Sequence, residues 1–480
     1  MTLPRTCALA FIPALLAGLV AWTGCGKRPA PRPNILYIMT DDHAAHMMSA
    51  YGSPVASTPN LDRIGAGGIR FDNAFCTNSL CAPSRATLLT GKYSHRNGKT
   101  TNFGPFDGSQ PTFPKLLQAA GYQTAMIGKW HLQSDPTGFD YWNILPGQGE
   151  YHDPVLIEMG EKKKHQGYVT DIITDIALGW LRGRDPARPF ALLYHHKAPH
   201  AQWVPDDKHV AMFEGQEIPE PATFDDDYQR RSIHVQQARN RIWPNLRDRF
   251  AAWSAWGKSV PEGLSPEEEK KAVYQRYVKD YMRVVASVDD NVGRVLDYLE
   301  EEGLAEDTVV IYTTDNGMFV GDHGWFDKRF MHEEALRVPL MIRYPRLIEP
   351  GRVTSLFALN VDYAPTILDL AGVEIPADMQ GRSLKPVLAG EQPADWRTSF
   401  YYHYYEFPGA HNVAKHCAVR SERYKLIRYY EEPQGWELID LETDPHEYQN
   451  VYDDPAYADA VNQMKAELAR LQAELGDQVE

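Results

Sequence analysis

The chain is poor in cysteine, with five among 480 residues: Cys7, Cys25, Cys76, Cys81 and Cys417. The first two fall in the N-terminal leader, so the rest of the chain keeps three, which do not make a disulfide framework. Either two of these three pair and one is left over, or at least one cysteine is present for its chemistry.

Positive charge is also scarce. The 49 basic residues face 64 acidic ones, which gives a formal net charge of −15. This balance argues against a nucleic-acid partner. An anionic ligand would therefore need a local cationic pocket inside a repulsive overall field.

Long hydrophobic runs are missing after the N-terminal leader. No later segment is long and apolar enough to span a bilayer. Residues 1–25 have the layout of a secretory signal: Arg5, an apolar run from Ala8 to Trp22, then small residues before Cys25. The tetrapeptide "WTGC" also looks like a bacterial lipobox, although Trp22 fits it poorly. We expect an exported protein, either periplasmic or an outer-membrane lipoprotein anchored at Cys25. Plain secretion and a membrane-anchoring helix are the alternatives.

What is present is a series of short apolar runs that end in polar residues. They are "PNILYIMTDD", "GYQTAMIGKWH", "RPFALLYHHKAPH" and "DTVVIYTTDNG". Runs of this kind are typical of strands buried on both faces of a largely parallel sheet. Amphipathic stretches between them, such as Tyr281 to Glu302, indicate helices. The pattern predicts an α/β fold, a sandwich of helix, sheet and helix.

The C-terminal tail has a different pattern. From Cys417 it predicts two or three antiparallel strands, and from Asp454 a helix with one apolar stripe. We expect a large α/β domain over residues 33–395 and a small α+β subdomain over residues 396–480.

Oxygen-bearing side chains follow two of the predicted strands: Asp41 and Asp42 after one, Asp315 and Asn316 after the other. Ligands of open α/β sheets bind beyond the carboxyl ends of the strands. Three carboxylates and an amide oxygen are hard ligands suited to Ca²⁺ or Mg²⁺. The alternative is four solvated loop residues.

Lys129, His131 and His200 add basic groups at the other strand ends, and Lys328 in "HGWFDKRF" is a further candidate. A metal ion and cationic donors that share the charge of equatorial oxygens suit a tetrahedral oxyanion such as sulfate or phosphate. A nucleophile is still missing. A cysteine thiolate could attack sulfur, but its product has no internal route of breakdown, whereas a hydrated aldehyde has one.

The stretch "CAPSR", Cys81 to Arg85, followed by "TGK", resembles the C-x-P-S-R signature of the type I sulfatases. The resemblance extends over almost the whole mature chain, including "GKWH", "APH", "TTDNG" and "RVPLMIRYP". It implies an alkaline-phosphatase-like fold with a large, mainly parallel mixed sheet and a small C-terminal antiparallel sheet. It also implies that a sulfatase-maturing enzyme oxidises Cys81 to Cα-formylglycine.

The resemblance assigns roles to residues position by position. Ca²⁺ would be bound by Asp41, Asp42, Asp315, Asn316 and an oxygen on the modified Cys81. Arg85 would hold the formylglycine, Lys129 and Lys328 the sulfate oxygens. His131 would act as the base and His200 as the acid that protonates the leaving alcohol, with His95 in a supporting role.

The implied activity is hydrolysis of sulfate esters of a carbohydrate by S–O cleavage. Two segments, "FDYWNILPGQGEYHDP" and "YYHYYEFPGAHNVAKH", resemble those of sulfatases that act on sulfated amino sugars, such as N-acetylglucosamine-6-sulfatases and mucin-desulfating enzymes. Three alternatives remain: a formylglycine-dependent phosphonate or phosphodiester hydrolase, a phosphomonoesterase, and a non-catalytic glycan-binding lipoprotein on a sulfatase scaffold.

Overall fold

The computed structural model describes residues 1–2, 32–253 and 263–479. Residues Pro33–Glu480 form one compact unit. The expected signal peptide and Cys25 lie outside the described residues, and the boundary expected at residue 395 stays a prediction. Among the described helices, none combines the length and the apolar character that crossing a membrane requires.

A ten-stranded mixed sheet forms the centre of this unit, in the order β13-β2-β12-β9-β1-β8-β4-β5-β6-β7. Its middle strands β9, β1, β8, β4 and β5 run parallel, whereas β12 is antiparallel to both β9 and β2. The strand bounds are β1 Asn34–Thr40, β2 Ile69–Phe71, β4 Gln123–Lys129, β5 Tyr141–Leu145, β6 Val155–Glu158, β7 Glu161–Lys164, β8 Phe190–His195, β9 Thr308–Thr314, β12 Leu340–Arg343 and β13 Arg352–Thr354.

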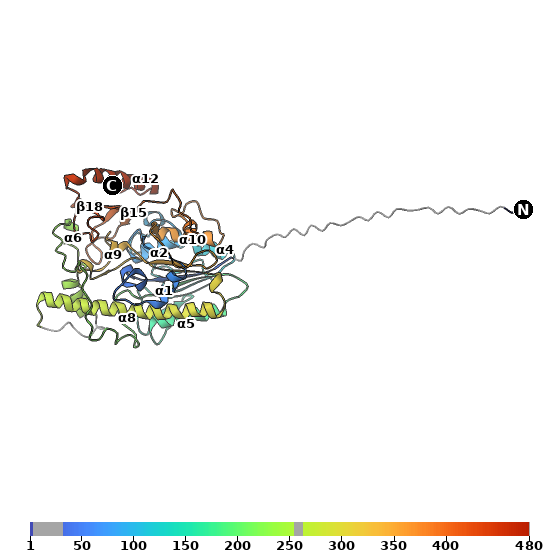
Figure 1. Cartoon of the computed structure of the whole chain (residues 1–480). Helices are drawn as coiled ribbons and strands as arrows, with labels where there is room; N and C mark the ends of the chain where they lie inside the picture. Colours follow the sequence, from blue (N-terminus) through green and yellow to red (C-terminus); the bar gives the residue numbers. More distant parts are fainter. Residues whose placement is uncertain (3–31, 254–262, 480) are drawn as a thin grey trace. The chain divides into compact units, whose positions relative to one another are not determined.

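Helices cover both faces of the sheet (Figure 1). Helices α1 (Pro59–Ala66), α5 (Val169–Gly183) and α8 (Pro266–Glu301) pack on one face, and α2 (Cys81–Thr90), α4 (Phe113–Ala119) and α10 (Tyr363–Leu370) on the other. Strand β1 serves both cores, because successive strand residues point to opposite faces. Its Ile35, Tyr37 and Met39 join the core beneath α2, α4 and α10, and its Leu36 and Ile38 join the core beneath α1, α5 and α8. The predicted helix-sheet-helix sandwich is confirmed.

The predicted helix from Tyr281 is longer than its apolar stripe indicated. Helix α8 begins at Pro266 because Ser265 and Glu268 form a reciprocal capping box, which satisfies the first free backbone N–H groups. Its buried face packs against α5 and α1.

The C-terminal residues form a four-stranded antiparallel sheet, which confirms the expected small sheet. Its strands are β15 Ser399–Tyr404, β16 His416–Ser421, β17 Tyr424–Tyr429 and β18 Gly435–Asp440. Helix α12 (Ala458–Leu475) packs on this sheet through Val461, Met464, Leu468 and Leu471. Strand β15 is additional to the predicted strands; all six of its residues are buried, so it lacks the alternation that marks a half-exposed strand.

Short elements complete the unit. They are helices α3 Ser94–Asn97, α6 Ile233–Gln236, α7 Arg247–Ala252, α9 Glu333–Leu336 and α11 Lys385–Leu388, and the strand pairs β3 Ala74–Phe75 with β14 Ala358–Leu359 and β10 Phe319–Val320 with β11 Phe326–Asp327.

Candidate active site

The two predicted oxygen pairs meet at the carboxyl ends of β1 and β9. Thr40 and Thr314, the last residues of these neighbouring parallel strands, are in register, so Asp41 and Asp315 emerge side by side. The Asp42 backbone N–H donates to Asp315 Oδ1 at 3.2 Å. All four side chains, those of Asp41, Asp42, Asp315 and Asn316, are buried.

The amide of Asn316 indicates what these oxygens could hold. Its Nδ2 donates to Asp42 Oδ1 at 2.6 Å, whereas its buried Oδ1 has no hydrogen-bond partner among the described residues. Carboxylate oxygens of Asp41, Asp42 and Asp315 lie within 4.8 Å of one another. A buried carbonyl oxygen without a partner is costly, and carboxylate and amide oxygens are the ligands that Ca²⁺ prefers, so this set fits a hard divalent ion such as Ca²⁺.

Cys81 begins helix α2 and faces the same point, with Sγ 3.4 Å from Asp41 Oδ1. Its side chain is only 1% exposed, and burial raises the pKa of the Cys81 thiol well above its ordinary value. The group is therefore a neutral thiol at neutral pH, which is a poor nucleophile.

Arg85 lies one helical turn after Cys81 and fixes this arrangement. Its Nε donates to Asp315 Oδ2 at 3.0 Å, and another guanidinium nitrogen donates to the Lys129 carbonyl at 2.6 Å. These bonds join helix α2 to the ends of β9 and β4. Helix α2 is buried throughout, so the guanidinium is held without access to bulk water.

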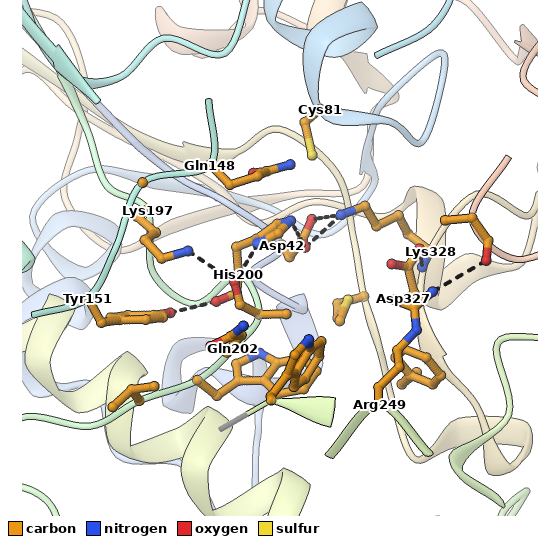
Figure 2. Close-up of a pocket in the computed structure, with 18 of the residues that line it drawn as sticks. Asp42, Cys81, Gln148, Tyr151, Lys197, His200, Gln202, Arg249, Asp327 and Lys328 are labelled. Atoms are coloured by element: carbon orange, nitrogen blue, oxygen red, sulfur yellow. Dashed lines mark hydrogen bonds and ion pairs between the residues drawn. The ribbon is translucent and has the colours of Figure 1, made fainter. Parts of the chain in front are cut away.

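The two predicted lysines reach the oxygen cluster from different elements. Lys129 ends β4 and contacts Asp41 and Gln148, whereas Lys328 follows β11 and places Nζ 2.6 Å from both oxygens of Asp42 (Figure 2). Gly128 precedes Lys129 in β4 and allows the close approach of β4 to β8. It has a φ of +103°, and a Cβ there would lie 1.8 Å from the His195 carbonyl oxygen.

The two predicted acid–base histidines are neutral. Burial, and then the charge of Lys129, lower the pKa values of His131 and His200 well below the ordinary imidazole value. The His200 Nδ1 donates to the Ala201 carbonyl at 2.7 Å, which leaves Nε2 directed toward the site, 3.8 Å from Asp42 Oδ2. His131 Nδ1 is buried and has no hydrogen-bond partner among the described residues.

The structure does not bring His95 to this group. Its Nε2 lies 3.0 Å from the Leu475 carbonyl oxygen and its Nδ1 3.3 Å from Asp477. His95 therefore contacts the C-terminal segment, and the supporting role expected for it stays a prediction.

A pocket of about 470 Å³ opens onto the site, and Asp42, Cys81, His200 and Lys328 line it. Further lining residues were not predicted: Asn102, Lys197, Asp327 and Arg329. Both aromatic-rich segments singled out in the sequence reach the pocket, through Gln148 and Tyr151 from one and His411 from the other. Lys197 could have been predicted from the sequence, because in "HHKAPH" it follows the apolar run of β8, as the other site residues follow their strands. Its ammonium lies 4.7 Å from the Tyr151 ring centroid, and burial lowers its pKa to about 8.

A buried oxyanion pocket at the carboxyl edge of an alkaline-phosphatase-like sheet defines a hydrolase of tetrahedral oxyanion esters. The family described as "Sulfatase" matches residues 33–373, and the one described as "N-sulphoglucosamine sulphohydrolase, C-terminal" matches residues 321–474. The chain belongs to the sulfatase family and is a sulfuric ester hydrolase, as the C-x-P-S-R resemblance predicted.

Individual relatives agree with this assignment. The chain is 44% identical to an N-acetylglucosamine-6-O-sulfatase of Bacteroides thetaiotaomicron, over 97% of this chain and 91% of that protein. It is 29% identical to the human N-acetylglucosamine-6-sulfatase, over 83% of this chain and 72% of that protein. A solved structure in complex with its substrate D-glucosamine-2-N,6-O-disulfate matches with a TM-score of 0.87 and 44% identity, over 93% of this chain and 99% of that one. A phosphonate monoester hydrolase of Agrobacterium radiobacter shares the fold, with a TM-score of 0.74 at 22% identity, over 92% and 96%.

Proposed function

We propose that this sulfatase removes a 6-O-sulfate group from an N-substituted glucosamine. The observation that carries the proposal is that Cys81, Asp42, His200 and Lys328 line one pocket, with Asp41 and Asp315 clustered against Asp42 and Lys129 in contact with Asp41. The amino-sugar substrate is supported by the 44% identical N-acetylglucosamine-6-O-sulfatase and by the 44% identical structure in complex with its substrate D-glucosamine-2-N,6-O-disulfate.

Two groups complete this site in our proposal. Cys81 is oxidised to Cα-formylglycine by a sulfatase-maturing enzyme, and Asp41, Asp42, Asp315 and Asn316 bind Ca²⁺. The formylglycine supplies a nucleophilic oxygen in place of the neutral thiol, and Ca²⁺ supplies positive charge where the sulfate binds.

The chain's own residues then bind the ester and move its protons. Lys129 and Lys328 hold sulfate oxygens from side chains that are already buried and oriented, and, against the effect of burial, the Asp42 carboxylate raises the pKa of Lys328 and keeps it charged. Arg85 orients the residue at position 81, and His131 offers a neutral imidazole as a proton acceptor. His200 is fixed through Nδ1 and can deliver a proton from Nε2 to the departing alcohol oxygen. The negative charge of the sulfate favours protonation of His200 when the substrate binds.

The test of the nucleophile combines activity with peptide mass spectrometry. Active protein should carry an aldehyde at position 81, and Cys81→Ala should fold but release no sulfate. Cys76→Ala is the matched control, because Cys76 is a buried thiol of the same loop with its Sγ 3.4 Å from Ser79 Oγ. It should retain the aldehyde and the activity. Full activity of protein with an unmodified thiol at position 81 contradicts the mechanism.

The test of the substrate is a panel of defined sugars assayed for released sulfate. N-acetylglucosamine 6-sulfate should be turned over in preference to the 3-sulfate isomer and to galactose 6-sulfate. Aryl phosphate and phosphonate esters are assayed in parallel, and a preference for either of them would favour the phosphonate or phosphodiester hydrolase. Binding of these sugars by matured protein without sulfate release would favour a non-catalytic glycan-binding lipoprotein.

We also propose that the chain is exported and anchored through Cys25. The proposal is supported by the N-terminal pattern of Arg5, apolar residues and "WTGC". Wild-type protein expressed in a Gram-negative host should fractionate with membranes, whereas Cys25→Ser should be soluble and keep its sulfatase activity. Equal fractionation of the two proteins contradicts the lipid anchor.

A further inference from the structure

Exposed aromatic side chains are rare on this protein. Among the Phe, Tyr and Trp residues that the structure describes, only Phe103 and Phe407 are exposed, at 72% and 47%. Single exposed apolar residues are ordinary on protein surfaces. What distinguishes these two is that segments far apart in the sequence bring them to the same place.

A buried carboxylate joins the two segments at the rim of the active-site pocket. Glu406, 6% exposed, accepts a hydrogen bond from the Asn102 backbone N–H at 3.1 Å. Its other oxygen lies 2.9 Å from an Arg329 guanidinium nitrogen. Asn102 and Arg329 both line the pocket. Phe103 follows Asn102 and Phe407 follows Glu406, and consecutive Cα atoms are about 3.8 Å apart. The backbones of both phenylalanines therefore leave from this junction, and their exposed rings project from it into solvent.

The backbone around each phenylalanine is also held. Lys99 Nζ donates to the Phe103 carbonyl oxygen at 3.0 Å, and the Asn412 backbone N–H donates to the Pro408 carbonyl oxygen at 2.8 Å. A surface that is ordered before a ligand arrives loses little conformational entropy when the ligand binds. The two rings thus have the properties of a preformed contact surface.

We propose that Phe103 and Phe407 form a platform that binds the sugar next to the sulfated one in an oligosaccharide. The inference rests on the proposed carbohydrate sulfatase function. The ring hydrogens of a sugar form an apolar face that packs on aromatic rings, and an uncharged platform suits a chain with a net charge of −15. Asn102 and Arg329 line the pocket together with Lys328, so a sugar that extends from the sulfate at Lys328 past Asn102 would meet this platform.

The test compares two substrates of one enzyme. One is the monosaccharide N-acetylglucosamine 6-sulfate, and the other is an oligosaccharide that carries the same sulfated sugar at its non-reducing end. The readout is the ratio of the two kcat/KM values. Phe103→Ala and Phe407→Ala should each lower the oligosaccharide-to-monosaccharide ratio about three- to tenfold, and the double variant about tenfold or more.

Val353→Ala is the matched control, because Val353 is 54% exposed on β13 and contributes nothing to the pocket lining. It should leave the ratio at the wild-type value. A double variant with an unchanged ratio overturns the platform, and so does an equal loss on both substrates.

A second measurement separates this inference from the proposed function. Calorimetric binding of the desulfated oligosaccharide should be about tenfold weaker for the double variant than for the wild type. If neither protein releases sulfate from any sugar but this difference is found, the proposed activity fails and the platform stands. If sulfate is released and the difference is absent, the platform fails and the activity stands.

Discussion

Lys328 illustrates how one residue shows that this pocket is built for an anion. Its ammonium is buried against both oxygens of Asp42. Burial alone lowers the pKa of Lys328, but the Asp42 carboxylate outweighs it and raises the pKa above the ordinary value, so the lysine stays charged. Buried ion pairs add little net stability, because desolvation offsets their attraction. A function in binding explains why the charge is kept.

Replacing Lys328 should therefore impair turnover even in protein that still folds. We expect Lys328→Ala to lower kcat/KM for the sulfate ester about 10²- to 10³-fold, because one preorganised charge at the oxyanion is removed. Lys162→Ala on the exposed strand β7 should match the wild type. The measurement is sulfate release under kcat/KM conditions, and a loss below about threefold for Lys328→Ala would refute its role.

His200 can be tested through the leaving group. His200→Asn should lower turnover of a sugar sulfate about 10²- to 10⁴-fold, because an alkoxide is a poor leaving group without a proton. The same variant should lose much less activity on an aryl sulfate, whose phenolate departs unprotonated. Equal losses on both substrates would contradict a role as general acid and indicate that His200 only binds the sulfate.

At the level of elements, a buried ion pair ties the C-terminal sheet to the large domain. Arg231 precedes helix α6, and its guanidinium binds both oxygens of Glu437 on β18, at 3.0 and 3.1 Å. Both side chains are buried. Removing one partner leaves an uncompensated buried charge, which is far more costly than losing an exposed pair.

Arg231→Ala should lower the free energy of unfolding in urea by about 3–5 kcal/mol. Arg470→Ala is the matched control, because Arg470 pairs with Glu467 and Glu474 on the exposed side of α12. Its effect should stay within about 0.5 kcal/mol. Similar losses in the two variants would show that the Arg231 pair does not hold the sheet in place.

The sequence predicted the central strands and the residues at their ends for one physical reason. Parallel buried strands are continuous apolar runs, and the polar residue that ends each run must lie at the same sheet edge. Asp41, Lys129 and Asp315 follow this rule. Asn102 and Arg329 do not, because loops bring them to the pocket through contacts such as Glu406, and these depend on tertiary packing. The contact of His95 with Asp477 could not be predicted either, because the position of His95 after the signature does not reveal which distant segment it meets.

At the scale of the whole molecule, buried neutral histidines make the fold sensitive to acid. Burial lowers the pKa of His416 on β16 to about 4 and that of His196 to about 3. An unfolded chain protonates these imidazoles near pH 6.5. The unfolded state therefore binds more protons between about pH 6.5 and 4, and stability falls as pH falls through this range.

His416→Gln should remove one of these groups from the balance. As the pH falls from about 6 to 4.5, the wild type should lose roughly 1.4 kcal/mol of unfolding free energy per pH unit more than the variant loses. Urea unfolding at several pH values measures it. A difference that is constant over this range would show that His416 is not the titrating group.

Calcium should stabilise the folded chain, because the side-chain oxygens of Asp41, Asp42, Asp315 and Asn316 come together only in the folded state. Added Ca²⁺ should raise the unfolding temperature of the wild type in proportion to the logarithm of its concentration above the Kd. Asn316→Leu removes the oxygen that has no other partner and should abolish most of the shift. An undiminished shift in this variant would place the ion elsewhere.

Cys81 lies far before β9 in the chain, and β9 leads to the Asp315 that holds helix α2 through Arg85. This separation has a consequence for biosynthesis. Helix α2 is buried throughout in the finished fold, but Asp315, which holds Arg85, is synthesised 234 residues after Cys81. At about 5–20 residues per second, this interval lasts roughly 10–50 s. During that time the "CAPSR" segment has no completed sheet edge to fold against. The proposed oxidation of Cys81 thus competes with chain completion, and slower elongation should increase the fraction of active enzyme.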